Sequence, residues 1–237
     1  MKVSDLLKRL ALGELSNLSL AEGGEIVHEK RATIMAHANE GLLRLHTRFV
    51  LRERNLLIRM RDGITFYHLR KQFAQSNYDP IVSVPSWDVP YILDLPHEPF
   101  EEDVIKILSI YDHEGTKLPI NDLNAPNSVF VPQAKMIQVP HVLDGRTLSV
   151  EYQAKHPELV FSHDFDQEIG IPDTLEAALT AFIADKIFSH MNTQENTAKG
   201  QEHAMLFETL CQDAVDMDLV NSSVSTTNNR FEIRGFM

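Results

Sequence analysis

Two stretches of the sequence place histidine and carboxylate side chains at spacings that metal sites use. The segment that begins at His28-Glu29 starts like the helix of a zinc protease, but Ala32 stands where that helix needs its second histidine. The segment from Asp164 resembles a calcium loop, yet its sixth position is Ile169 instead of glycine and its twelfth is Leu175 instead of a carboxylate. Neither pattern is complete.

A looser cation site at His163, Asp164 and Asp166 stays open, and it would make the protein a metal-assisted hydrolase. The alternative interpretation is an acidic, solvated loop that precedes a helix. Other catalytic signatures are missing, because the sequence has no G-x-S-x-G elbow, no phosphate-binding loop and no G-x-G-x-x-G. The single cysteine, Cys211, excludes a zinc site built on a cysteine pair and an intramolecular disulfide. Since Cys211 lies on an apolar helical stripe, we expect it to be a small buried side chain. Because the catalytic signatures are missing, we expect no cofactor and no enzymatic activity.

Composition and charge restrict the function classes further. The chain has 237 residues, of which 43% are apolar, and this length fits one large domain or two small ones. Its formal net charge of −12 argues against a general nucleic-acid binder, whose footprint is basic. Charged residues interrupt the N-terminal segment, and no apolar run reaches the roughly 18 residues of a membrane span, so we expect a soluble protein made in a cytoplasm.

The charge is unevenly distributed along the chain. The window from Arg44 to Lys71 has a net charge of +6, and an acidic stretch follows at Glu98, Glu101, Glu102 and Asp103. A charged run is often a solvated face, but opposite patches also suit a subunit that joins a copy of itself. The candidate inter-subunit residues are Arg48, Arg52, Arg54, Arg59, Arg61, Glu98, Glu101 and Glu102.

Helical patterns lie at both ends of the chain. Ser4 is a good N-cap for a short helix that Gly13 would end, and a three- and four-residue apolar period predicts a second helix from about residue 25 to about residue 48. Near the other end, Asp173 could cap a helix with a wide apolar face, with Glu176 three residues later. After a short break a last helix should pack antiparallel to it, with Gly200 among the small residues that allow close approach.

The middle of the chain has the pattern of short strands. Period-two alternation, many prolines and the Asp62-Gly63 and Asp144-Gly145 hairpin signals predict a small antiparallel sandwich or barrel from about residue 50 to about residue 160. Because the end helices must meet to bury their apolar faces, we predict an α+β fold, with a helical bundle and an inserted antiparallel β domain. The predicted parts are N-terminal bundle helices 1–49, a β domain 50–162, C-terminal bundle helices 163–220 and an extended arm 221–237.

The arm combines a polar tether with a strand-like end. Ser222 to Asn229 are small and, apart from Val224, polar, and apolar and charged side chains then alternate at Arg230, Phe231, Glu232, Ile233, Arg234 and Phe236. This pattern suits strand addition at the sheet edge of a partner. Folding back onto the β domain of the same chain is the alternative.

Three stretches together resemble a bacteriophage head-to-tail connector (adaptor) protein, of the tail tubular A-like type found in short-tailed phages. They are "ANEGLLRLHTRFVLRERNLLIRM", "DVIKILSIYDHEGTKLPINDLNAPNSVFVPQAKMIQVP" and "LEAALTAFIADKIFSHMNTQENTAKGQEHAMLFETLCQDAVDMDLVN". The resemblance lies in the pattern of residue types along each segment and in the order of the segments, and it covers most of the chain from about residue 25. It carries no catalytic signature.

The resemblance implies a structural virion protein that forms a ring of about twelve copies between the portal and the tail. DNA would pass through the lumen without sequence-specific binding, the arm would dock on the portal, and the next tail component would be a nozzle or tail tube. No membrane is involved, and the protein would be made in the host cytoplasm. The alternative is a non-virion assembly or binding module with a β recognition domain, for which Trp87 could serve as a partner anchor or simply cap the β domain.

Overall fold

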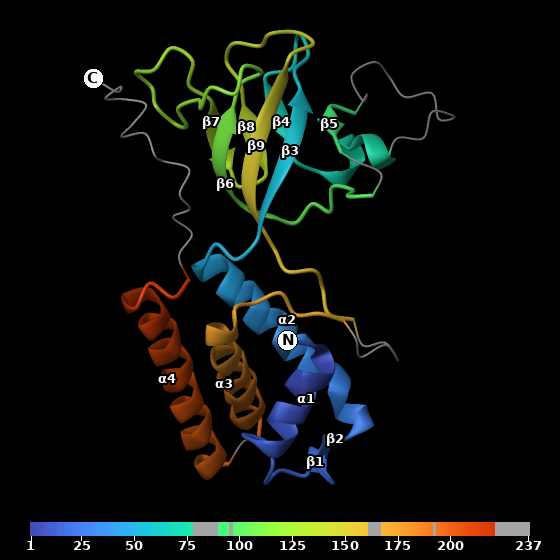
Figure 1. The fold of residues 1–237 in the computed structure, drawn as a ribbon, viewed down its shortest axis with the longest axis vertical. Coiled ribbons are helices and arrows are strands. Elements are labelled where there is room, and N and C mark those ends of the chain that lie inside the picture. The colour runs from blue at the N-terminus through green and yellow to red at the C-terminus, as the bar shows by residue number, and fades with distance from the viewer. Residues whose placement is uncertain (78–89, 95–96, 161–166, 192, 221–237) are drawn as a thin grey trace, which may run out of the picture. The chain divides into compact units, whose positions relative to one another are not determined.

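The computed structural model describes residues 1–77, 90–94, 97–160, 167–191 and 193–220. It confirms the α+β fold, in which both ends of the chain form helices and the middle of the chain forms antiparallel sheets (Figure 1). Internal contacts divide the chain into two compact units: Met1–Leu51 with His156–Met237, called the helical unit, and Arg52–Lys155, called the β unit.

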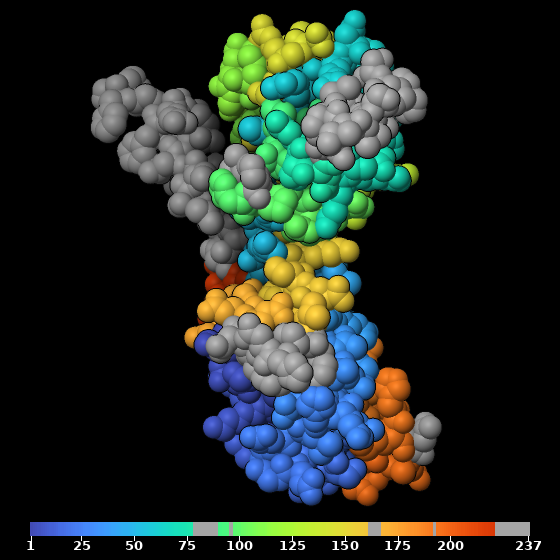
Figure 2. All heavy atoms as spheres, turned by 90° about the vertical axis from the view of Figure 1, so that its right-hand side faces the viewer, coloured from blue at the N-terminus to red at the C-terminus, as the bar shows by residue number. Residues whose placement is uncertain are grey.

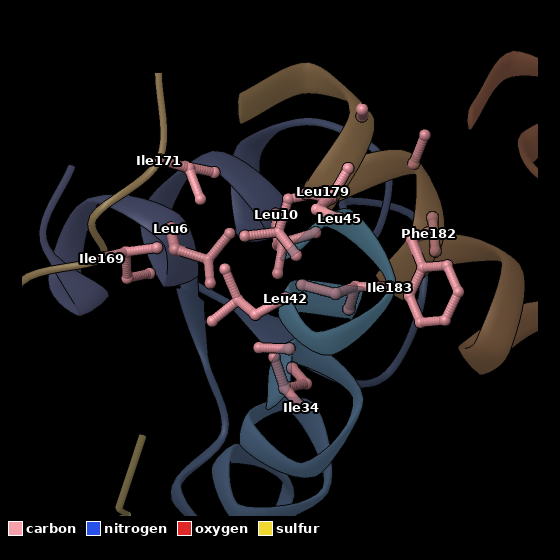
Figure 3. Packing of buried hydrophobic residues seen from close by; sticks show 14 of the residues in the cluster. Leu6, Leu10, Ile34, Leu42, Leu45, Ile169, Ile171, Leu179, Phe182 and Ile183 are labelled. Atoms are coloured by element: carbon pink, nitrogen blue, oxygen red, sulfur yellow. The ribbon is translucent and has the colours of Figure 1, made fainter. Parts of the chain in front are cut away.

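The helical unit is organised around α3 (Asp173–Ser189), which is apolar on nearly every side. Three helices surround it: α1 (Val3–Leu12), α2 (His28–Arg48) and α4 (Gln194–Asp216). Figure 3 shows how side chains of α1, α2, α3 and the segment before α3 meet in one core, to which the following labelled residues belong: Leu6, Leu10, Ile34, Leu42, Leu45, Ile169, Ile171, Leu179, Phe182 and Ile183. The surface view shows the N-terminal residues in blue beside α3 and α4 residues in orange (Figure 2).

Two glycines let neighbouring helices approach α3 closely. A Cβ atom on Gly41 of α2 would lie 2.8 Å from Leu179 Cδ1 and 2.9 Å from Phe182 Cδ1. A Cβ atom on Gly200 of α4 would lie 2.6 Å from Ser189 Oγ and 3.2 Å from its backbone nitrogen. The predicted close approach at Gly200 is therefore confirmed.

The chain returns from the β unit along α2 and α1. The Asn39 side chain accepts a hydrogen bond from the Leu159 N–H (2.8 Å) and donates one to its carbonyl (2.9 Å). Farther on, Ile169 N–H donates to the Met1 carbonyl, and Val3 N–H donates to the Gln167 carbonyl. Before α2, a short hairpin of β1 (Ala21–Glu22) and β2 (Glu25–Ile26) completes this unit.

The β unit contains two antiparallel sheets that share one apolar core. The first has the order β5 (Ile92–Leu93), β3 (Glu53–Arg59), β9 (Thr147–Ala154) and β6 (Val104–Tyr111). The second has the order β4 (Phe66–His68), β8 (Met136–Gln138) and β7 (Phe130–Gln133). Two short 3-10 turns, Lys71–Phe73 and Gln75–Asn77, follow β4.

The two Asp-Gly pairs form turns, but neither closes the predicted hairpin. Gly63 and Gly145 adopt φ values of 78° and 75°, which glycine tolerates without strain. Each turn lies between strands of different sheets, since β3 pairs with β5 and β9, and β4 pairs with β8. The turns lie together, because Asp62 N–H donates to Asp144 Oδ1 over 3.0 Å. They therefore carry the chain from one sheet to the other.

Three predicted helix starts were wrong. The first helix begins at Val3 with Lys2 as N-cap, because Asp5 accepts a hydrogen bond from the Lys2 N–H. The second begins at His28, since residues 25–26 form β2. The third has Pro172 as N-cap, and Glu176 is buried beside Arg9, whose Nη1 lies 2.5 Å from Glu176 Oε2. A partner distant in sequence thus takes the carboxylate that local patterning assigned to a cap.

We predict that Gly41→Val lowers the free energy of unfolding of the helical unit by about 1–3 kcal/mol, because its side chain must displace Leu179 and Phe182 in a packed core. Urea unfolding followed by helical circular dichroism measures the effect. Gly170→Ala is the control, since a Cβ there meets nothing within 4 Å. A Gly41→Val protein as stable as the wild type would contradict the close α2–α3 packing.

Candidate interaction surfaces

Arg54 of β3 binds two carboxylates of its own chain. Its Nη2 lies 3.1 Å from Glu98 Oε1, and its Nη1 lies 3.2 Å from Asp103 Oδ2. The side chains of Arg54 and Asp103 are only 10% and 12% exposed, so this pair is largely withdrawn from water. Part of the predicted basic face is therefore neutralised by part of the predicted acidic face within one molecule.

Asp103 is the centre of this network. Its Oδ1 accepts a hydrogen bond from the Tyr152 hydroxyl at 3.1 Å, and its carbonyl accepts one from Lys155 N–H at 2.7 Å. Arg52 Nη1 is 3.9 Å from Asp103 Oδ2 and also donates to the Lys155 carbonyl. The acidic segment is thereby tied to the ends of β3 and β9. Sequence analysis placed Asp103 in an acidic stretch but had no signal for its partner Tyr152.

Glu101 and Glu102 also bind cations of the β unit. Lys71 Nζ lies 2.6 Å from Glu101 Oε2, and Lys135 Nζ lies 3.2 Å from Glu102 Oε1 and 3.0 Å from its carbonyl. Partial burial alone would raise the pKa of Glu102, but bonds from the Lys71 N–H and from Lys135 bring the pKa below its usual value. Glu102 has a φ of 56°, a left-handed conformation that costs on the order of 1–3 kcal/mol and that these contacts hold in place.

In the helical unit, Glu208 of α4 joins two arginines of α2. Arg48 Nη1 lies 2.6 Å from Glu208 Oε2, and Arg44 Nη2 lies 3.1 Å from Glu208 Oε1. The Arg48 hydrogen bond is the largest cause that lowers the pKa of Glu208 below its usual range. The Arg44 guanidinium also lies 5.5 Å from the centre of the Phe207 ring, a cation–π distance.

Two candidate arginines have no ion pair among the residues that the structure describes. Arg59 is exposed on β3, and Arg61 donates to the Pro90 carbonyl at 3.1 Å. The structure thus brings Arg48, Arg52 and Arg54, together with Glu98, Glu101 and Glu102, into ion pairs within the chain. An inter-subunit role for these residues stays a prediction.

Other candidates are buried or lie outside the described residues. Cys211 is fully buried, and burial raises the pKa of its thiol, as expected for a core side chain. The cation candidates His163, Asp164 and Asp166, the residue Trp87 and the arm 221–237 are outside the described part of the chain. Across the described ranges, no cluster of three or more metal-ligating side chains occurs and no helix could span a membrane.

Two histidines meet where α2 packs against the end of α3. The rings of His37 and His190 have centroids 5.6 Å apart, and His190 Nδ1 lies 2.5 Å from the Lys186 carbonyl oxygen. Lys186 Nζ in turn lies 2.6 Å from Glu40 Oε1. Burial, then the neighbouring His190, lowers the pKa of His37, while Glu40 opposes the change.

Comparison with protein-family models finds no match, and no curated protein matches the chain.

We predict that Arg54→Ala lowers the free energy of unfolding of the β unit by about 1–3 kcal/mol, since it leaves the carboxylate of Asp103 largely buried with a weaker partner. Arg59→Ala removes the same side-chain type from an exposed position and should change it by less than about 0.5 kcal/mol. Urea unfolding followed by near-ultraviolet circular dichroism compares the two. Equal losses would show that the Arg54 network adds no stability.

We also predict that the helical unit loses stability as the pH falls below about 6.5. The unfolded chain protonates His37 at its ordinary pKa, and the folded chain resists protonation to lower pH, so acid favours unfolding through that window. Unfolding free energies at about pH 8 and about pH 5.5 should differ less for His37→Gln than for the wild type. His141→Gln, in the other unit, is the control, and an unchanged pH dependence for His37→Gln would contradict the assignment.

Proposed function

We propose that this chain is a structural virion protein, the subunit of a head-to-tail adaptor ring. About twelve copies would form a ring between the portal and the tail, with DNA passing through the lumen. The arm 221–237 would dock on the portal, and the β unit would face outward or towards the next tail component. No catalysis is part of the proposal.

The observation that carries the proposal is the construction of the molecule from two separate cores. Both ends of the chain build the helical core, and a continuous insertion builds the β core. An adaptor must hold its place in a ring and also contact different neighbours above and below. Two cores supply one body for the ring wall and a second body whose loops can adapt to a neighbour without disturbing the first.

The segment order agrees with the family resemblance. Residues 28–48 form α2, and residues 173–189 and 194–216 form the paired helices α3 and α4 with a short connection. The chain then continues for 17 more residues past Val220. The polar tether at residues 222–229 could extend by about 26–29 Å, which is enough to leave the helical unit and reach a neighbour.

Charge supports a passive role towards DNA. The chain has a net charge of −12, and many of its arginines already bind carboxylates of the same chain. A duplex carries about one negative charge per 1.7 Å, so a lumen with few free cations would let it slide without adhering.

Deletion of Arg230–Met237 tests the portal contact. We expect the truncated protein to keep the circular dichroism spectrum of the full chain but to lose co-purification with the portal protein of the same virus, because the apolar anchors Phe231 and Phe236 are gone. Replacement of the polar tether residues Thr226 and Thr227 by serine, which keeps the length and the anchors, is the control.

Electron microscopy of the protein with its portal completes the test. We expect a closed ring on the portal for the full chain and bare portals for the truncated chain. A truncated chain that binds as tightly as the full chain, or that unfolds, would assign the arm to another role. A full chain that never joins the portal would favour the non-virion binding module.

A further inference from the structure

The β unit has an open groove beside the network of Glu102. It has a volume of about 750 Å³ and lies between the end of β4, the following 3-10 turn and the connection of β7 to β8. Its polar lining is mostly cationic or amide-bearing: His68, Arg70, Lys71, Gln72, Gln133 and Lys135, with Glu102 as the carboxylate.

The charges in the groove do not cancel. Lys71 and Lys135 bind Glu101 and Glu102 and are neutralised by them. Arg70 is exposed, and its charge contributes to the lowered pKa of Glu102, but its guanidinium has no hydrogen bond or ion pair to any residue in the described ranges. A guanidinium is always protonated and offers a planar pair of donors, so Arg70 can bind a carboxylate that the described residues of its own chain do not supply.

The surroundings favour a carboxylate on a protein over the phosphates of DNA. Residues 52–155 contain 11 basic and 14 acidic residues, so the field of the β unit repels a polyanion. DNA binding depends on several cations that each neutralise a phosphate, and the groove has a single unpaired one. The neutral amides of Gln72 and Gln133 beside Arg70 instead suit one or two carboxylates on a polypeptide.

The same chain carries a matching acidic surface on α4. Glu195 and Glu208 pair with cations of the helical unit, but Glu202 and Asp213 are exposed and have no ion pair within the described residues. They are 11 residues apart, about three turns and 16 Å, so they share the face opposite the buried Phe207. Asp216 extends this acidic stripe (Glu202, Asp213 and Asp216) at the C-terminal end of the helix.

We propose that the groove of one copy binds the acidic stripe of α4 in a second copy. The partner copy supplies the carboxylates that Arg70 lacks. Because groove and stripe are different surfaces, the contact is head-to-tail, and repetition either closes a ring or grows a fibre. This inference rests on the proposed function, since it names the surfaces that would join copies in the ring.

Charge reversal on each surface tests the contact. The groove variant is Arg70→Glu with Gln72→Glu, and the stripe variant is Glu202→Lys with Asp213→Lys. We expect wild-type oligomers in native mass spectrometry, and self-association about 10–100-fold weaker in either variant. Lys117→Glu and Gln201→Lys are the controls, because Lys117 is an exposed cation of the β unit outside the groove lining and Gln201 is about 100° around α4 from Glu202.

A mixture of the two variants gives the sharpest result. The groove variant retains its stripe, the stripe variant retains its groove, and the two reversed surfaces are complementary to each other, so we expect the mixture to form alternating oligomers although neither variant associates by itself. Combining both reversals in one chain should restore longer oligomers. Isotope labelling of one variant identifies the mixed oligomers, and about 1 M salt should weaken them by screening.

Four outcomes would overturn the inference. They are wild-type chains that stay monomeric up to their solubility limit, variants that oligomerise like the wild type, a mixture without mixed oligomers, and duplex DNA binding that Arg70→Glu abolishes. Portal docking separates this inference from the proposed function. If the groove variant still forms closed rings on the portal, the adaptor function stands and another surface joins its copies.

Discussion

The whole arrangement depends on one constraint, the burial of α3. A helix that is apolar on nearly all sides can be stable in water only when other elements cover each side. Those elements, α1, α2 and α4, come from both ends of the chain. The ends must therefore meet, and whatever lies between them has to leave and return at neighbouring points. Because both ends of the chain are needed to cover α3, the β unit lies between them in the sequence, as an insertion.

The β unit shows how charged segments are used once a chain folds. Its acidic segment 98–103 is short, follows Pro96 and contains Pro99, so little regular structure holds it in place. Ion pairs from β3, from the turn after β4 and from the connection of β7 to β8 hold it in place. Two of these partners, Arg54 and Asp103, are nearly buried, where removal of either leaves a charge that water cannot solvate well. The network therefore stabilises the position of the segment 98–103 in addition to forming a charged surface.

Intramolecular pairing changes which surfaces remain available to a partner. An evenly exposed basic face would attract any polyanion. Pairing neutralises part of that face. Among the described residues, it leaves Arg70 without an ion pair in the groove, and Glu202 and Asp213 without one on α4. Self-association through such sparse charges would be selective and sensitive to salt, because few pairs carry it and each is partly solvated.

The sequence by itself determined the fold class, because apolar periodicity is a local property. The three- and four-residue spacing of Ile34, Ala38, Leu42 and Leu45 could be recognised without any tertiary information, as could the need for Gly200 where two helices approach. Only the tertiary structure decided which strands pair, since the Asp62-Gly63 and Asp144-Gly145 turns look like hairpins locally but connect different sheets. It alone also paired Arg54 with Asp103 and Lys135 with Glu102. Ion pairs between residues distant in sequence follow from strand order and register, which no local spacing encodes.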